Sequence, residues 1–221
     1  EYITGNMLPL TQSILSSLVY SAGVVVFSII ISIGPARLLA RHDFPFKVLI
    51  ETALMLPLFI PAIVVSLGSY PVLLRMNLID NYAGVILIIG VTAYPYMLKT
   101  LTAGFESYSP NLELTAKMFR APFYKKLMTV HFPQLLPAIV SGSIIVFLVS
   151  FTEYFLVFLV GGGVVKSFAG YLIPFLKSGD WSSASALSLI FIIFPLTFYI
   201  LSDRLMLGYY RKRGIKTGAT I

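Results

Sequence analysis

The apolar residues of this 221-residue chain gather into five blocks of about 20 residues each. The blocks cover about 14–36, 48–67, 84–103, 135–160 and 184–201. A helix rises about 1.5 Å per residue, so about 20 residues cross the ~30 Å of hydrocarbon in a bilayer. Lipid offers no partner for a backbone amide, and the blocks lack the alternation of a barrel strand. The predicted fold class is therefore all-α, a polytopic membrane protein with five visible transmembrane helices.

The composition agrees with this prediction, because 57% of the residues are hydrophobic and only 11% are charged. Soluble domains carry about 25% charged residues, so we do not expect a soluble fold. A net charge of +7 is also found in proteins that bind nucleic acid. Here the basic residues flank the ends of the apolar blocks, where anionic lipid headgroups are their neighbours. We therefore expect membrane lipid, and no nucleic acid, as the partner of these charges.

The basic residues also predict the orientation of the chain, because Lys and Arg in short loops are retained on the cytoplasmic side. Thirteen of the 16 Lys and Arg residues fall on the side of the C-terminal tail. Only Arg75, Lys166 and Lys177 fall on the other side. We expect the N-terminal segment outside and the C-terminus in the cytoplasm.

A polar segment, residues 106–133, interrupts the apolar sequence with "ESYSPNLELTAKMFRAPFYKKLMTVHFP". Ser109 followed by Pro110 is typical of a helix start, and Pro122 disfavours helix at the residue before it. A second short helix then carries apolar residues at i, i+4 and i+7, and Pro133 ends it. Two amphipathic helices of this kind form either a docking surface at the inner membrane face or a loop that rests on the headgroups.

The segment at 112–139 resembles the cytoplasmic signature loop of binding-protein-dependent ABC importer permeases, known as the EAA loop. The resemblance continues in "ARLLARHDFPFK" (36–47), "LMLPLFIPAIVVSLG" (54–68) and "VSFTEYFLVFLVGGG" (149–163). These segments follow the order and spacing of the family over nearly all of the chain. The resemblance implies a single type I permease domain over residues 1–221, with a cytoplasmic coupling loop at 106–133.

Two positions of the loop depart from the family pattern when the register is counted back from Pro133. Leu114 falls on the glutamate and Arg120 on the glycine, while Thr115 and Ala116 fall on the two alanines. The resemblance then implies that the ATPase contacts come from this stretch: Glu113, Thr115, Ala116, Lys117, Phe119, Arg120, Ala121 and Tyr124. Because the motif is degenerate, we expect a second, different permease subunit that keeps the intact loop.

The resemblance further implies that this chain hydrolyses nothing. It would work with two ATP-binding subunits, which carry ATP and Mg²⁺, and with an external solute-binding protein. The sequence "GGGVVKS" at 161–167 resembles a phosphate-binding loop, but that motif requires glycine before the lysine, and position 165 is valine. His42 and His131 lie 89 positions apart without acidic partners at ligand spacing. We therefore predict no catalytic residue, no metal site and no cofactor on this chain.

Glu153 is the acidic residue that the sequence places inside the fourth block. A carboxylate inside a span costs about 3 kcal/mol unless it faces protein or water, so we expect it to face inward. One interpretation is a translocation pathway lined by Ser150, Thr152, Glu153 and Tyr154, with a preference for a cationic solute. The alternatives are a buried hydrogen bond to the partner permease, or a position close enough to the outer surface to be wet.

We conclude from the sequence that the chain is the permease subunit of a bacterial ABC importer in the cytoplasmic (inner) membrane. The permeases it looks most like handle polyamines, iron, thiamine, sulfate or organophosphonates. The family has six spans per subunit, so we expect an earlier helix before Glu1. The alternative is a secondary transporter or channel subunit driven by an ion gradient, which would show inverted repeats or several intramembrane charges.

Overall fold

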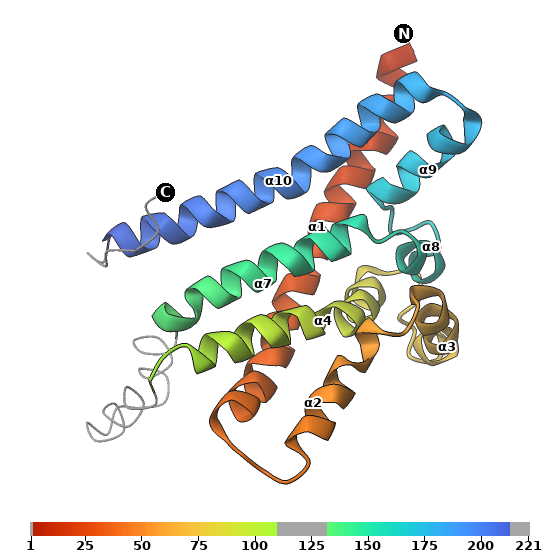
Figure 1. Ribbon diagram of the computed structural model, residues 1–221. Coiled ribbons are helices and arrows are strands. Elements are labelled where there is room, and N and C mark those ends of the chain that lie inside the picture. The colour runs from red at the N-terminus through yellow and green to blue at the C-terminus, as the bar shows by residue number, and fades with distance from the viewer. Residues whose placement is uncertain (1, 110–131, 213–221) are drawn as a thin grey trace.

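The computed structural model describes residues 2–109 and 132–212, and every regular element in these two ranges is a helix (Figure 1). The elements are α1 (Tyr2–Arg41), α2 (Lys47–Met55), the 3-10 helix η1 (Leu56–Leu58), α3 (Ala62–Arg75), α4 (Tyr82–Glu106), α7 (Phe132–Thr152), α8 (Phe155–Gly161), α9 (Phe168–Ser178) and α10 (Trp181–Lys212). The all-α prediction is confirmed.

Four helices in the described ranges are long and apolar enough to cross a membrane: Pro9–Arg41, Tyr82–Glu106, Phe132–Thr152 and Trp181–Arg211. The second predicted span, near residues 48–67, is a bent pair in which Lys47–Leu58 and Ala62–Arg75 meet at 93°. Counting this pair as one span gives the five spans that the sequence predicts. The second span is therefore broken, whereas its apolar block suggested one continuous helix.

Prolines account for the break in the second span. Pro57 lies in η1, and Pro61 is the N-cap of α3 with an extended backbone at φ −56° and ψ 137°. A proline disfavours helical backbone at the residue before it, so the chain leaves the first helix at this point. Pro95 and Pro195 lie instead inside the continuous helices α4 and α10. Helices α1 and α7 also contain proline, so the same residue type breaks one span and is tolerated in four others.

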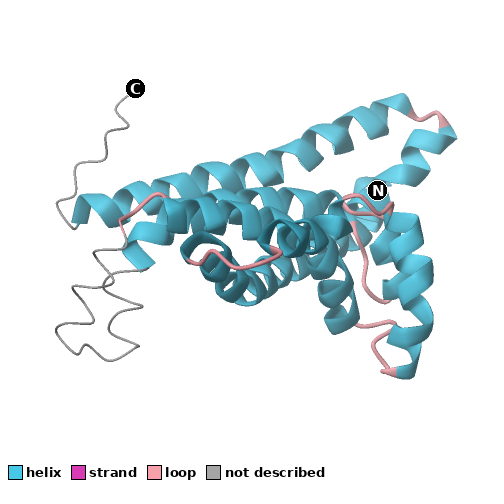
Figure 2. Cartoon of the chain, turned by 60° about the horizontal axis from the view of Figure 1, so that its bottom comes forward, coloured by secondary structure: helices cyan, strands magenta, loops and turns pink. Residues whose placement is uncertain are grey.

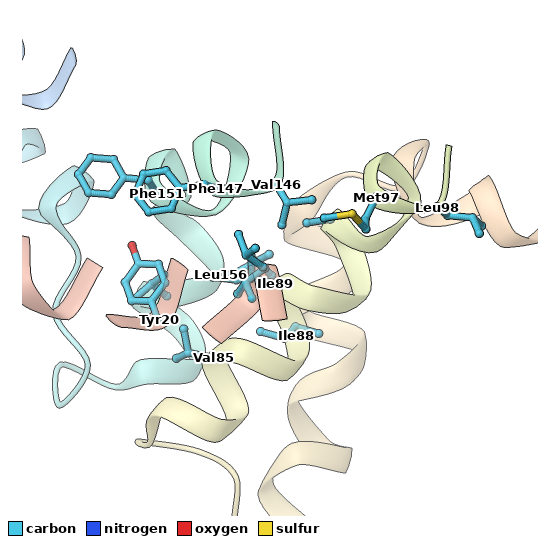
Figure 3. Close-up of a cluster of buried hydrophobic side chains, with 14 of the residues drawn as sticks. Tyr20, Val85, Ile88, Ile89, Met97, Leu98, Val146, Phe147, Phe151 and Leu156 are labelled. Atoms are coloured by element: carbon cyan, nitrogen blue, oxygen red, sulfur yellow. The ribbon is translucent and has the colours of Figure 1, made fainter. Parts of the chain in front are cut away.

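The core lies where α1, α4, α7 and α8 meet (Figure 3). Figure 3 shows Tyr20 of α1 facing a group of buried apolar side chains from α4, with Phe147 and Phe151 of α7 and Leu156 of α8 around them. Dispersion between closely packed side chains, together with apolar burial inside the bundle, holds these helices in contact.

Helices α4 and α7 approach each other closely because each supplies a glycine at the contact. A methyl group on Gly104 would lie 2.5 Å from the Cβ of Ala138, and one on Gly142 would lie 2.7 Å from the sulfur of Met97. Small residues at such positions let helix backbones come together, as is common between membrane helices.

Helix α10 lies at the edge of the bundle, where it runs past α7 as a long rod (Figures 1 and 2). Only 11% of the residues in its apolar window are buried, against 56% in α4. Its clearest contact with α7 is the stacked pair Phe147 and Phe198, whose ring centres lie 4.0 Å apart. In the first half of α10, Phe191 and Phe194 join Phe151 of α7 in an aromatic cluster.

Candidate functional site

The fourth predicted span, 135–160, is not one helix, because α7 ends at Thr152 and α8 begins at Phe155. Glu153 lies at this junction. Its Oε1 accepts hydrogen bonds from the backbone amides of Phe155 at 3.1 Å and Leu156 at 3.2 Å. The first amides of a helix lack partners inside the helix, and a carboxylate there also meets the positive end of the helix dipole. Glu153 thus satisfies the start of α8 and does not sit in the middle of a continuous span.

The other predicted pathway residues occupy three different surroundings. Ser150 is fully buried, and its hydroxyl donates to the carbonyl of Val146 in its own helix at 2.8 Å. Thr152 lines an apolar groove between α7 and α10. Tyr154 lines a different space, a cavity of about 560 Å³ beside α8 and α9. The structure therefore does not place the four side chains on one surface of the described chain.

The α8–α9 cavity is bordered by the N-terminal part of α1, by α8, by the turn that follows α8, and by α9. Its lining residues are Pro9, Ser13, Tyr154, Val157, Phe158, Gly163, Val165, Lys166, Ser167, Gly170, Tyr171, Ile173, Pro174 and Lys177. Two of these side chains are cationic, and none of them is acidic. The walls are otherwise apolar or neutral, so the two lysines determine the charge of the cavity.

Lys166 and Lys177 stand at two points of this border. The ammonium group of Lys166 donates to the amide oxygen of Gln12 on α1 at 2.8 Å, which holds the side chain against α1. Lys177 lies in the last turn of α9 and is exposed. A concave surface with one sign of charge raises the local concentration of ions of the opposite sign. The cavity is therefore suited to attract anions.

Helix α9 is fastened to α1 at its first residue. The amide of Phe168 donates to the hydroxyl of Ser17 at 2.8 Å, and the amide of Gly170 donates to the hydroxyl of Ser167 at 2.9 Å. These two bonds satisfy amides that the start of a helix leaves without partners. They also place Lys166, two residues before α9, against α1.

The eight predicted ATPase-coupling residues lie outside the described residues: Glu113, Thr115, Ala116, Lys117, Phe119, Arg120, Ala121 and Tyr124. The structure does describe both ends of that segment. Helix α4 ends at Glu106, three residues before the last described position, and α7 begins at Phe132. Each end is held by a side chain from a helix that is distant in the sequence.

At the first end, Arg41 in the last turn of α1 holds Tyr108. The Nη2 of Arg41 donates to the carbonyl of Tyr108 at 3.0 Å, and the guanidinium carbon lies 4.5 Å from the centre of the Tyr108 ring. The ring in turn lies 6.2 Å from that of Phe105 in α4. A charged donor and a cation–π contact thus act on the same residue.

At the second end, the hydroxyl of Tyr210 in α10 donates to the carbonyl of Pro133 at 2.8 Å, in a buried position. In an α-helix this carbonyl would accept from the amide of residue 137, but residue 137 is proline and has no N–H. Tyr210 therefore supplies the donor that the helix lacks. The Pro133–Pro137 spacing signals a carbonyl without a helical partner, yet the sequence gives no sign of which side chain reaches it.

Residues 24–213 match a family model described as "Binding-protein-dependent transport system inner membrane component". The matched range includes all of the transmembrane elements from the middle of α1 onward.

Several curated proteins are similar to this chain. The molybdenum transport system permease protein ModB of Escherichia coli K12 is 30% identical over 162 residues, which cover 66% of this chain and 69% of the relative. The molybdate/tungstate permease protein WtpB of Thermococcus kodakarensis is 24% identical, over 60% of this chain and 53% of its own length. The sulfate permease protein CysT of Escherichia coli K12 is 24% identical, over 74% and 64%.

A solved structure shares the fold. A chain in the crystal structure of a bacterial ABC transporter involved in the import of the acidic polysaccharide alginate superimposes with a TM-score of 0.68 at 18% identity. The superposition covers 89% of this chain and 75% of that one.

Proposed function

This chain belongs to the family of binding-protein-dependent transport system inner membrane components as an ABC importer permease subunit, and we propose that its solute is a small oxyanion of the molybdate, tungstate or sulfate class. The observation that carries this proposal is the α8–α9 cavity, which is bordered by two lysines and, among the side chains that the structure describes, by no acidic one. The names of the similar permeases support the same class of solute.

This solute class is narrower than the one that the sequence suggests. Polyamines, iron and thiamine are cations, so the proposal of an anionic solute excludes them. The one feature that favoured a cation was the carboxylate of Glu153, which receives two backbone amides at the start of α8. Its charge is therefore used inside the fold, which removes the argument for a cationic solute. A gradient-driven secondary transporter is not favoured, because the family match is to a binding-protein-dependent system.

The proposed importer contains other subunits besides this chain. We assign to it two ATP-binding subunits that hydrolyse ATP, a second permease subunit and an external solute-binding protein. The segment 106–133 would engage an ATP-binding subunit in the cytoplasm, and the C-terminus would lie on the same side. The α8–α9 cavity then lies at the outer face, where the solute arrives.

The side chains of this chain have two tasks in that scheme. Lys166 and Lys177 attract a dianion to the outer face, because a concave surface with one sign of charge concentrates ions of the opposite sign. The bonds that fasten α9 to α1 and cap α8 keep the walls of the cavity in place. Neither task requires a chemical step on this chain.

The proposal is tested by purifying the chain with its partner subunits and reconstituting the complex in proteoliposomes with the binding protein. We expect ATP-dependent uptake of at least one of molybdate, tungstate and sulfate. Putrescine and thiamine, supplied at the same concentrations, should neither enter nor compete. Uptake of putrescine or thiamine in preference to the three anions would contradict the proposed solute, and a complex without an ATPase would contradict the proposed importer.

A further inference from the structure

The two ends of the segment 110–131 are held by side chains from α1 and α10, which the peptide chain does not join to it. We propose that Arg41 and Tyr210 are positioning residues that make these two helices follow the coupling loop. The proposal rests on the proposed function, in which the loop receives the motion of the ATP-binding subunits. It adds the physical route by which that motion reaches the outer helices.

The loop is joined covalently to two helices only. Residue 109 leads back into α4, and residue 132 is the first of α7. A force on the loop therefore acts directly on α4 and α7, and it reaches other helices only through non-covalent contacts. Among the described residues, the contacts of Tyr108, Phe132 and Pro133 with other helices lie close to where that force enters.

The C-terminal half of α10 meets α7 at separate points. Close to the loop these are the bond from Tyr210 to Pro133 and the edge-on contact between the rings of Tyr209 and Phe132, whose centres lie 6.4 Å apart. A cavity of about 360 Å³ lies between the two helices, bordered among others by Leu136, Val140, Phe198 and Leu205. On one side of this cavity the rings of Phe147 and Phe198 stack. On the other side lies the bond from Tyr210 to Pro133. The Tyr210 hydroxyl thus supplies the hydrogen bond that holds the end of α10 to α7 beyond the cavity, next to the ring contact of Tyr209 with Phe132.

The carbonyl of Pro133 makes this bond difficult to replace. Pro137 leaves it without a helical donor, and Pro133 is buried, so the loss of the tyrosine hydroxyl leaves a buried acceptor without the partner seen here. A buried polar group that loses its partner is costly. The carbonyl and the hydroxyl are therefore held together, and α10 moves when the start of α7 moves.

Arg41 joins α1 to the other end of the segment, where Tyr108 leads into residues 110–131. Helix α1 is tied to α4 by the hydroxyl of Tyr82, which bonds Ser16 at 3.0 Å, and by Ser32, which donates to the carbonyl of Tyr94 at 3.3 Å. Both bonds lie well before the last turn of α1. The bond from Arg41 to Tyr108 fixes that last turn to the residue where the loop begins. Each loop end is thereby shared between two helices.

The inferred route also reaches the solute side. Helix α10 begins beside α9. The ring centre of Phe191 in α10 lies 5.5 Å from that of Phe168, the first residue of α9. Helix α9 borders the α8–α9 cavity with Lys177. Helix α10 is continuous from Trp181 to Lys212, so motion at Tyr210 is carried along it toward the wall of that cavity.

The test uses the reconstituted complex with the variants Y210F, R41Q and the double variant. The readout is the number of anions imported per ATP hydrolysed, with molybdate, tungstate and sulfate supplied to wild type first. A purely structural defect lowers uptake and ATP hydrolysis together and leaves this ratio unchanged. We expect each single variant to lower the ratio about fivefold, as for the loss of one hydrogen bond, and the double variant to lower it further.

Control variants show whether an effect comes from the hydrogen bonds of Arg41 and Tyr210, which we call the anchors, or from the change of residue type alone. Y199F removes the same hydroxyl from an exposed position in the same helix, and R75K changes an exposed arginine at the end of α3. Both should keep the wild-type ratio. R41K, which retains a cationic donor, should recover part of the ratio lost in R41Q.

A second readout does not depend on the solute. The chain has no cysteine, so spin labels can be placed on I145C in α7 and L205C in α10 without background. We expect a narrow distance distribution in the assembled complex, unchanged by trapping with ATP and vanadate, and a broadened one in Y210F but not in Y199F. If wild type imports none of the three anions, the proposed solute fails and this measurement decides the anchor. If wild type couples normally and every variant keeps its ratio, the anchors are refuted and the proposed function stands.

Discussion

The hydroxyl of Ser17 in α1 accepts a hydrogen bond from the amide of Phe168, 151 residues further along the chain, at 2.8 Å. This bond joins the first long helix to the start of α9, one of the helices that border the α8–α9 cavity. Both residues are buried, so the bond lies away from water. The position of Lys166 beside α1 depends on it.

Replacing Ser17 with alanine should destabilise the protein, because the buried amide of Phe168 would lose its acceptor. The expected loss is about 1–3 kcal/mol of stability. It would be measured as a lower thermal unfolding temperature in detergent. Ser185 bonds within its own helix at an exposed position, so S185A is the matched control and should change stability by less than about 0.5 kcal/mol. Equal effects of the two variants would argue against the Ser17 contact.

Two variants of Glu153 distinguish a role of its carboxylate in capping α8 from a role in the transport pathway. E153Q keeps an oxygen that can accept from the amides of Phe155 and Leu156, so uptake and thermal stability should both stay close to wild type. E153A removes the acceptor and should cost about 0.5–2 kcal/mol of stability, the usual range for the loss of a helix cap. Uptake assays and thermal unfolding of both variants decide the matter. Loss of uptake in E153Q at unchanged stability would show that the charge acts in the pathway.

The close approach of α4 and α7 predicts that Gly104 does not tolerate a side chain. In G104A the new methyl group would lie 2.5 Å from the Cβ of Ala138, so the helices must separate. Overpacking of this kind costs about 1–3 kcal/mol. The control is G208A in α10, where no atom lies within 4 Å of the added methyl group. That variant should be stabilised by about 0.5–1 kcal/mol through helix propensity, and thermal unfolding would reveal opposite shifts.

The two lysines of the α8–α9 cavity should affect the capture of solute more than its passage. K166Q/K177Q removes both positive charges, so the KM for the transported anion should rise about threefold or more while kcat changes little. Added salt should narrow the difference from wild type, because exposed charges are screened. K47Q is the control, since Lys47 pairs with Asp43 at 3.0 Å near the start of α2. A fall in kcat at constant KM would contradict this role.

The apolar blocks were sufficient to predict the spans and the fold class, because lipid leaves a spanning backbone no alternative to a helix. The prolines indicated where spans could bend, but they did not distinguish Pro61, where the chain turns by 93°, from Pro95, which a helix accommodates. The difference depends on neighbouring helices, which must re-satisfy the freed carbonyl. For Glu153, the apolar run hid a helix junction that the carboxylate itself supports.

The sequence by itself determined that this chain is a helical membrane protein of the permease family, since hydrophobic length and a local motif are read along the chain. Only the tertiary structure decided which side chains meet across it. The spacing of Pro133 and Pro137 reveals a carbonyl without a donor, but Tyr210 lies 77 residues away. Likewise, Ser17 reaches Phe168 and Arg41 reaches Tyr108 only because helices pack. Such contacts depend on the directions of whole helices, which no local pattern specifies.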